Sequence, residues 1–275
     1  MKGKITTLVE NSVARPGVCG EHGLAVLIEI DGKSVLFDTG ATDLLLLNAK
    51  TLGTDLSNVD SIVLSHGHYD HTGGLAAALS TMDTPVVYAH PDAFLRRYVR
   101  WKGDAREIGI PHSKEAIEGS GGKLSLSSKP QEVAPGIMLT GEVPRITAFE
   151  DTGGAFFLDE ECSEPDLIND DQAIVIDAPE GLIVIVGCAH SGIVNTLLRV
   201  QRLFPDVPVS AIVGGMHLIN ASEERMAETV VMLRSLDPRQ VVAGHCTGWK
   251  ACCRLADRFG DVFDLLSTGY TLSFG

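Results

Sequence analysis

The sequence has 275 residues, 44% of them hydrophobic, and a formal net charge of −14 at pH 7. This length and apolar content predict a folded protein with a large buried core. The negative charge argues against a nucleic-acid-binding surface, because contacts to phosphates need clustered Lys and Arg side chains. A small-molecule partner or a metal ion is compatible with it.

The N-terminal segment 1–11 has no apolar run after its lysines, so no signal peptide is predicted. No stretch of about 18 uninterrupted apolar residues occurs, which predicts no membrane span. Six cysteines in a chain of this kind are expected to be reduced thiols and not a disulfide framework. These features predict a cytoplasmic protein and leave its oligomeric state open.

Strands and short helices alternate through the first 89 residues. Asp31-Gly32 favours a tight hairpin turn between two apolar segments, and the backbone turns again at Asp38-Thr39-Gly40. The predicted elements are strands at 24–30, 34–37, 61–64 and 86–89, and helices at about 42–52 and 75–79.

The same alternation resumes near residue 173, where Pro179-Glu180-Gly181 favours a second hairpin. Here the predicted elements are strands at 173–176, 181–186, 209–213 and 240–243, helices at 193–204, 223–236 and about 249–259, and a short C-terminal strand. Two mixed sheets, each faced by helices, would bury these elements. We therefore predict a single α/β domain over 1–275, a four-layer αββα sandwich.

The segment from about 91 to 145 interrupts this pattern. Its apolar content is too low for a core of its own, and its Lys and Arg outnumber its Asp and Glu in an otherwise acidic chain. Phe94, Tyr98 and Trp101 share helical spacing, which predicts a basic and aromatic helix. We interpret the segment as a lid or insertion of the same domain.

Four potential metal ligands, His66, His68, Asp70 and His71, fall within six residues directly after a predicted strand. Positions two apart in extended backbone point the same way, so His66 and His68 can converge on one ion, and Asp70 and His71 can face a second. Mixed imidazole and carboxylate ligands suit zinc, manganese or iron better than calcium. With nine histidines in the whole chain, three in six positions are not expected by chance.

Three further histidines follow predicted strands: His190, His217 and His245. A single histidine after a strand is usually a turn residue. Three at equivalent places, in a chain that already holds the cluster, indicate further ligands or acid–base groups, because each ion needs three or more protein ligands.

Residues 66–71 match the His-x-His-x-Asp-His signature of the metallo-β-lactamase superfamily, which the whole sequence resembles. The Phe-Asp-Thr-Gly turn at 37–40 and the strand-end residues His190 and His245 follow in the expected order. The segments 187–193, 214–218 and 244–248 resemble a subgroup named 7,8-dihydropterin-6-methyl-4-(β-D-ribofuranosyl)aminobenzene-5′-phosphate synthase.

The resemblance implies two divalent ions, zinc first and iron or manganese as alternatives. It implies one site from His66, His68 and a third histidine, and another from Asp70, His71 and His245. This sequence departs from the pattern at two places. Cys188 stands where an aspartate commonly bridges the ions, and the usual third-histidine position falls near Gly141-Glu142, so Cys188, His190 or Glu142 could complete the first site.

The resemblance further implies an enzyme that acts on a phosphorylated or pterin-like small molecule through a metal-activated water or a metal-polarised substrate. Asp70 is the candidate to orient that water. His217 is the candidate to donate a proton or contact a substrate oxygen, with an ordinary turn residue as its alternative. Arg96, Arg97 and Arg100 are candidate phosphate contacts, although a solvated basic helix face explains them as well.

Two other functions are compatible with the same motifs. One is an iron-bearing redox protein, although no Cys-x-x-Cys motif accompanies the cluster. The other is a metal-binding ligand receptor with little turnover. Metal analysis separates the enzyme from the redox protein, and single-turnover assays separate it from the receptor.

Overall fold

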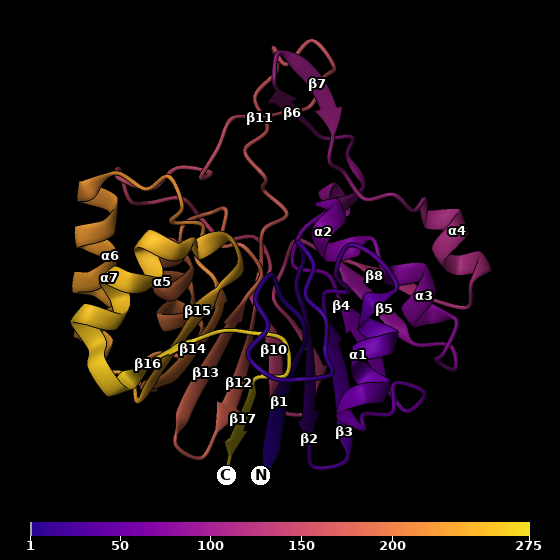
Figure 1. The fold of residues 1–275 in the computed structure, drawn as a ribbon, viewed down its shortest axis with the longest axis horizontal. Helices are drawn as coiled ribbons and strands as arrows, with labels where there is room; N and C mark the ends of the chain where they lie inside the picture. The colour runs from indigo at the N-terminus through magenta and orange to yellow at the C-terminus, as the bar shows by residue number, and fades with distance from the viewer. Residues whose placement is uncertain (1) are drawn as a thin grey trace.

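Two seven-stranded mixed sheets lie face to face in the computed structural model, which describes residues 2–275 (Figure 1). The first sheet has the order β17 (Thr271–Phe274), β1 (Gly3–Val9), β2 (Ala25–Ile30), β3 (Lys33–Phe37), β4 (Ser61–Val63), β5 (Val86–Ala89) and β8 (Lys123–Leu126). The second has the order β16 (Phe263–Leu265), β15 (Gln240–Gly244), β14 (Val209–Gly215), β13 (Gly181–Val186), β12 (Ala173–Ala178), β10 (Ile137–Leu139) and β9 (Gln131–Ala134).

Helices cover the outer face of each sheet, which confirms the predicted αββα order (Figure 1). Against the first sheet lie α1 (Leu44–Leu52), α3 (Leu75–Leu79) and α4 (Lys114–Gly119). Against the second lie α5 (Ile193–Leu203), α6 (Glu223–Leu236) and α7 (Trp249–Phe259). Within residues 2–275, no helix combines the length and apolar character needed to cross a bilayer. All six cysteines lie in the described part of the chain and are free thiols.

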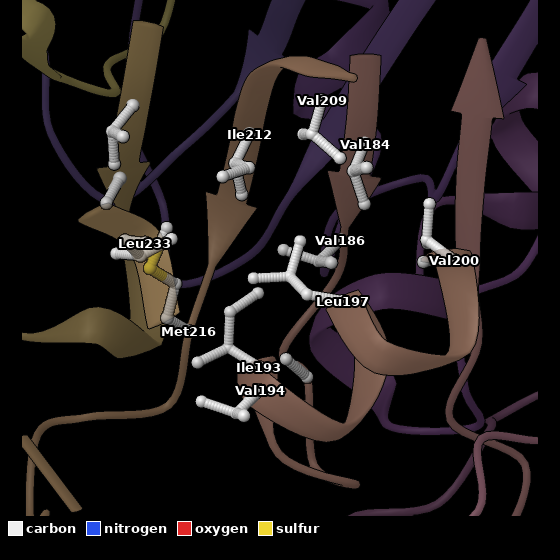
Figure 2. Packing of buried hydrophobic residues seen from close by; sticks show 14 of the residues in the cluster. Val184, Val186, Ile193, Val194, Leu197, Val200, Val209, Ile212, Met216 and Leu233 are labelled. Carbon is white, nitrogen blue, oxygen red and sulfur yellow. The ribbon is translucent and has the colours of Figure 1, made fainter. Parts of the chain in front are cut away.

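Strand β13 shows how the apolar sequence serves two cores. All six of its residues are buried, because alternate side chains face a helix layer and the opposite sheet. Val184 and Val186 belong to the same buried cluster as Leu197 of α5, and Figure 2 shows Val186 next to Leu197. Ile183 and Ile185 point into the core between the two sheets. This central position explains why the strand reads as a continuous apolar run.

Strand β1 is not among the predicted elements. Its β-branched run Ile5-Thr6-Thr7 favours a strand, and it pairs with both β2 and β17. The pairing with β17 joins the two ends of the chain within one sheet, a long-range contact that local sequence pattern does not reveal.

The segment 91–145 differs from the predicted helix. It begins with a short 3₁₀ helix (Pro91–Phe94) and continues as an antiparallel hairpin of β6 (Tyr98–Trp101) and β7 (Asp104–Glu107). Lys102 and Gly103 both have positive φ, so they form a two-residue turn of the hairpin type. The helix prediction is wrong because the backbone becomes extended at Leu95, and Tyr98–Trp101 then pair with Asp104–Glu107 across this turn.

The rest of the segment belongs to the body of the domain. Strand β8 forms an edge of the first sheet, and β9 and β10 form an edge of the second. The β6–β7 hairpin, extended by β11 (Phe156–Phe157), is the part that projects beyond the sheets in Figure 1.

Candidate metal centre

The cluster at 66–71 follows β4 and runs into the short helix α2 (Tyr69–Thr72), which holds Asp70 and His71. His66 and His71 are completely buried, and His68 and Asp70 nearly so. Gly67 between them cannot carry a side chain, since a Cβ there would lie 2.0 Å from the carbonyl oxygen of Ala93. The backbone packs at this point so that the ligand candidates all turn toward the interior.

The other histidines reach this place from the second sheet. Strands β13, β14 and β15 are parallel, so their carboxyl ends lie at one edge. His190, His217 and His245 follow these three strands and gather at that edge, next to the cluster. Their positions after the strands agree with the sequence-based prediction.

His66, His68 and His190 form the first group of candidate ligands. One ring nitrogen from each lies within 4.8 Å of the other two. His190 donates from Nδ1 to the carbonyl oxygen of Thr152 at 2.8 Å, which leaves the lone pair of a neutral ring on Nε2. The Nε2 atoms of His190 and His68 are buried without a hydrogen-bond partner among the described residues. His66 Nε2 and His68 Nδ1 lie 2.9 Å apart, and the unsatisfied Nε2 of His190 belongs to the same group of three rings, an arrangement that fits a metal ion.

The first group is neutral. Burial lowers the pKa of His66, His68 and His190 well below the ordinary histidine value, and the neighbouring rings lower the pKa values of His66 and His190 further. Neutral imidazole is the form that binds metals.

Asp70, His71 and His245 form the second group. His71 Nδ1 donates to Asp38 Oδ2 at 2.7 Å, and His245 Nδ1 bonds Asn11 Oδ1 at 2.9 Å. Both Nε2 atoms therefore turn inward, where they lie 3.2 Å apart, with Asp70 Oδ2 at 3.7 Å from the first and 3.5 Å from the second.

This second arrangement also fits a cation. Two nitrogens bound tetrahedrally to one zinc ion lie about 3.3 Å apart, close to the observed separation. Although burial favours the neutral ring, the carboxylates of Asp70 and Asp38 raise the pKa of His71 to about 9. The group thus stabilises positive charge at the position where the two Nε2 atoms meet.

Cys188 lies between the two groups. Its Sγ is 3.2 Å from His71 Nε2, and it shares one candidate ligand set with His66 and His71 and another with His190 and His217. Burial raises the pKa of this thiol well above its ordinary value. Cys188 would therefore be a thiolate only where a cation stabilises the charge, as a bound metal does.

The two groups border a cavity of about 320 Å³. Its walls include His68, Asp70, Cys188, His190, His217 and His245. A larger groove of about 570 Å³ lies between α6 and α7, but its lining holds none of these histidines. The convergence of titratable groups, and not size, identifies the smaller cavity as the candidate active site.

Comparison with known proteins agrees with this geometry. A family profile described as "Metallo-beta-lactamase superfamily" matches residues 20–245. The chain belongs to the metallo-β-lactamase superfamily. It is 33% identical to a curated Methanocaldococcus jannaschii protein named 7,8-dihydropterin-6-methyl-4-(beta-D-ribofuranosyl)-aminobenzene-5'-phosphate synthase, over 98% of this chain and 96% of that protein.

Solved structures support the same superfamily fold. Tm1679, described as a metal-dependent hydrolase of the beta-lactamase superfamily, has a TM-score of 0.84 and 31% identity, covering 98% of each chain. The short form of human tRNase Z has a TM-score of 0.56, 12% identity and 99% coverage of each chain, which shows likeness of fold alone.

The structure shows which residues lie at the two positions where this sequence departs from the superfamily pattern. His190, not Glu142, lies beside His66 and His68. The Glu142 carboxylate is half-exposed and lies 4.0 Å from His90 Nε2. Cys188 occupies the space between the two groups, where the superfamily commonly has an aspartate.

Several residues that support the cluster are not among the predicted site residues. Asp38 accepts hydrogen bonds from the backbone nitrogen and Oγ of Ser65, both at 2.7 Å, as well as from His71. Glu10 accepts from the backbone nitrogen of His245. His22 lies 3.3 Å from Asp70. The Phe-Asp-Thr-Gly segment predicted that Asp38 lies in a turn, but only the fold shows that its carboxylate contacts His71.

His217 lies on the cavity wall with its ring centroid 4.4 Å from that of His190. Its φ of 43° is in the left-handed region, and its Nδ1 is buried with no hydrogen-bond partner among the described residues. A non-glycine residue held in this backbone conformation at a cavity often has a functional reason.

The three arginines predicted to contact substrate lie outside the cavity lining. Arg97 is completely buried and cannot serve this role, because it bonds Asp166 at 2.7 Å and Asp170 at 2.8 Å. Arg96 pairs with Glu107 at 3.0 Å. Arg100 donates to the carbonyl oxygen of Glu161 at 2.9 Å.

Proposed function

We propose that this protein is a two-metal enzyme that acts on a phosphorylated, pterin-like small molecule, with zinc as the preferred metal. The main support is the pair of inward-facing Nε2 atoms on His71 and His245, which lie 3.2 Å apart beside the Asp70 carboxylate. The name of the M. jannaschii relative supports a pterin and a ribose phosphate as parts of the reacting molecules.

His66, His68 and His190 would hold one ion, and Asp70, His71 and His245 the other, with Cys188 as a ligand between them. Divalent ions at these positions supply Lewis acidity and lower the pKa of water toward about 7. The residues behind the ligands fix their orientation. Asp38 orients His71, and the Thr152 carbonyl orients His190.

Two side chains of the chain itself would handle the water and the proton. Asp70 presents a carboxylate oxygen toward His71 and His245, where it can accept a hydrogen bond from the attacking water and orient it. Nδ1 of His217 has no hydrogen-bond partner among the described residues, and in the tautomer that carries the proton there it would donate to the leaving group. Together they provide one acceptor and one donor at the cavity.

The test combines metal analysis with turnover. Wild-type protein and the His68→Ala variant are analysed by inductively coupled plasma mass spectrometry. Both are assayed with phosphoesters, with thioesters, and with a 7,8-dihydropterin plus a β-D-ribofuranosylaminobenzene 5′-phosphate. The matched control is His112→Ala, since His112 bonds the Gly73 carbonyl outside the cavity lining.

We expect two divalent ions per wild-type chain and turnover of at least one phosphorylated or pterin substrate. His68→Ala should lose metal and at least a hundredfold in kcat/KM, while His112→Ala keeps both within about threefold. Retained metal and activity in His68→Ala would overturn the proposal. Redox-active iron without turnover would favour the redox protein, and tight ligand binding without turnover would favour the receptor.

A further inference from the structure

The β6–β7 hairpin has two chemically different faces. Val99 pairs with Arg106 and Phe156 pairs with Val99, so the side chains of these three residues lie on one face of the small sheet. Trp101 and Ile108 are two residues from Val99 and Arg106 and continue that face. All five of these residues line the cavity: Val99, Trp101, Arg106, Ile108 and Phe156.

The opposite face carries two of the three arginines that were predicted to contact phosphate. Arg96, Tyr98 and Arg100 alternate with the cavity-facing set. Their polar groups bond acidic or carbonyl partners on that side, namely Glu107, Glu160 and Glu161. These interactions hold the hairpin in place and leave the first face directed at the cavity.

Arg106 is the only Arg or Lys among the described residues that line the cavity. Its guanidinium lies over the ring of Tyr69, 5.5 Å from the centroid, and no carboxylate of the described residues lies within ion-pair distance of it. Trp101, on the same face, exposes 58% of its surface. The exposed tryptophan ring can stack on a flat aromatic ring, and the cation beside it, which has no acidic partner, can bind an anionic group on the same ligand.

We propose that Arg106 binds the phosphate of the substrate while Trp101 stacks on its aromatic ring, so that this hairpin face determines specificity. The proposal rests on the proposed function only in taking this cavity as the substrate site.

Fluorescence can test this without turnover. The chain has two tryptophans, so Trp249→Phe leaves Trp101 as the single reporter. This metal-replete variant is titrated with 4-nitrobenzylphosphonate and with neutral 4-nitrobenzyl alcohol, both quenchers that share one ring. Arg106→Met and Arg106→Lys are added to the same background. Arg100→Met, the same change on the opposite face, is the matched control, and circular dichroism and metal content verify each fold.

We expect saturable quenching by the phosphonate. Arg106→Met should raise its Kd at least tenfold and leave the alcohol within twofold, with Arg106→Lys intermediate and Arg100→Met unchanged. Equal effects of Arg106→Met and Arg100→Met, equal effects on the two ligands, or no saturable quenching would overturn the proposal. Metal content and turnover are separate readouts, so a failed two-metal mechanism with an intact binding profile contradicts only the proposed function.

Discussion

His71 Nε2 and His245 Nε2 lie 3.2 Å apart although 174 positions separate them in the sequence. His71 follows strand β4 of the first sheet, and His245 follows β15 of the second. An ion between these atoms would therefore connect the two sheets as well as serve the chemistry, which couples metal binding to the stability of the whole fold.

Removing metal should accordingly destabilise the protein. Free zinc at a hundred times its Kd contributes about 2.7 kcal/mol to the free energy of unfolding, provided that the unfolded chain does not bind it. We expect dialysis against a chelator to lower the thermal midpoint and added zinc to restore it. Calcium serves as the control ion, and an unchanged midpoint after verified metal loss would contradict the coupling.

Asp38→Asn should weaken metal binding without removing a ligand. The amide cannot accept all the hydrogen bonds that Asp38 accepts from Ser65 and His71, so the orientation of His71 is lost. Changes of this kind cost about 10–100-fold in metal affinity. Competition with a chromophoric chelator measures the Kd, and Asp60→Asn, at an exposed ion pair with Lys33, is the control that should match wild type.

Cys188→Ser should remove a thiolate ligand, because its Sγ lies 3.2 Å from His71 Nε2. In cobalt-substituted protein we expect a sulfur-to-cobalt charge-transfer band that is present in wild type and lost in the variant. Cys162→Ser, at another buried thiol, should keep the band. A band that persists without Cys188 would assign the sulfur ligand to Cys246, which belongs to a candidate set with Cys188 and His245.

Arg97→Ala should destabilise the fold by about 3–5 kcal/mol, because it leaves the buried carboxylates of Asp166 and Asp170 without their cation. Arg96→Ala breaks only exposed pairs with Glu107 and Glu160 and should change the stability far less. Urea denaturation measures both free energies of unfolding. Similar losses in the two variants would show that burial does not govern these pairs.

Tyr270 should make stability depend on alkaline pH. Burial and the hydrogen bond to Asp264 raise the pKa of its phenol above the ordinary value of 10.0. A raised pKa means that the folded state holds the proton more tightly, so this stabilisation is complete below pH 10 and is lost as pH rises further. The thermal midpoint of Tyr270→Phe should fall less between pH 9 and about pH 11 than that of wild type; equal falls would exclude this role.

Strand-end positions were predictable because parallel strands bring their carboxyl ends to one edge, whatever the loops contain. His190 and His245 followed from that rule, and the 66–71 cluster followed from spacing alone. The position of strand ends could not show whether His190 or Glu142 lies beside His66, because the neighbours of His66 depend on how the two sheets face each other.

Local sequence thus determined the fold class and brought four candidate metal ligands together at 66–71, because residues within six positions share one loop. Tertiary structure decided which distant groups complete the cluster and which arginine faces the cavity. Arg97 and Arg106 are chemically the same residue. Strand pairing across the turn at Lys102-Gly103 gives this segment a period of 2 in place of the helical 3.6, and the packing of the hairpin buries Arg97 and directs Arg106 to the cavity.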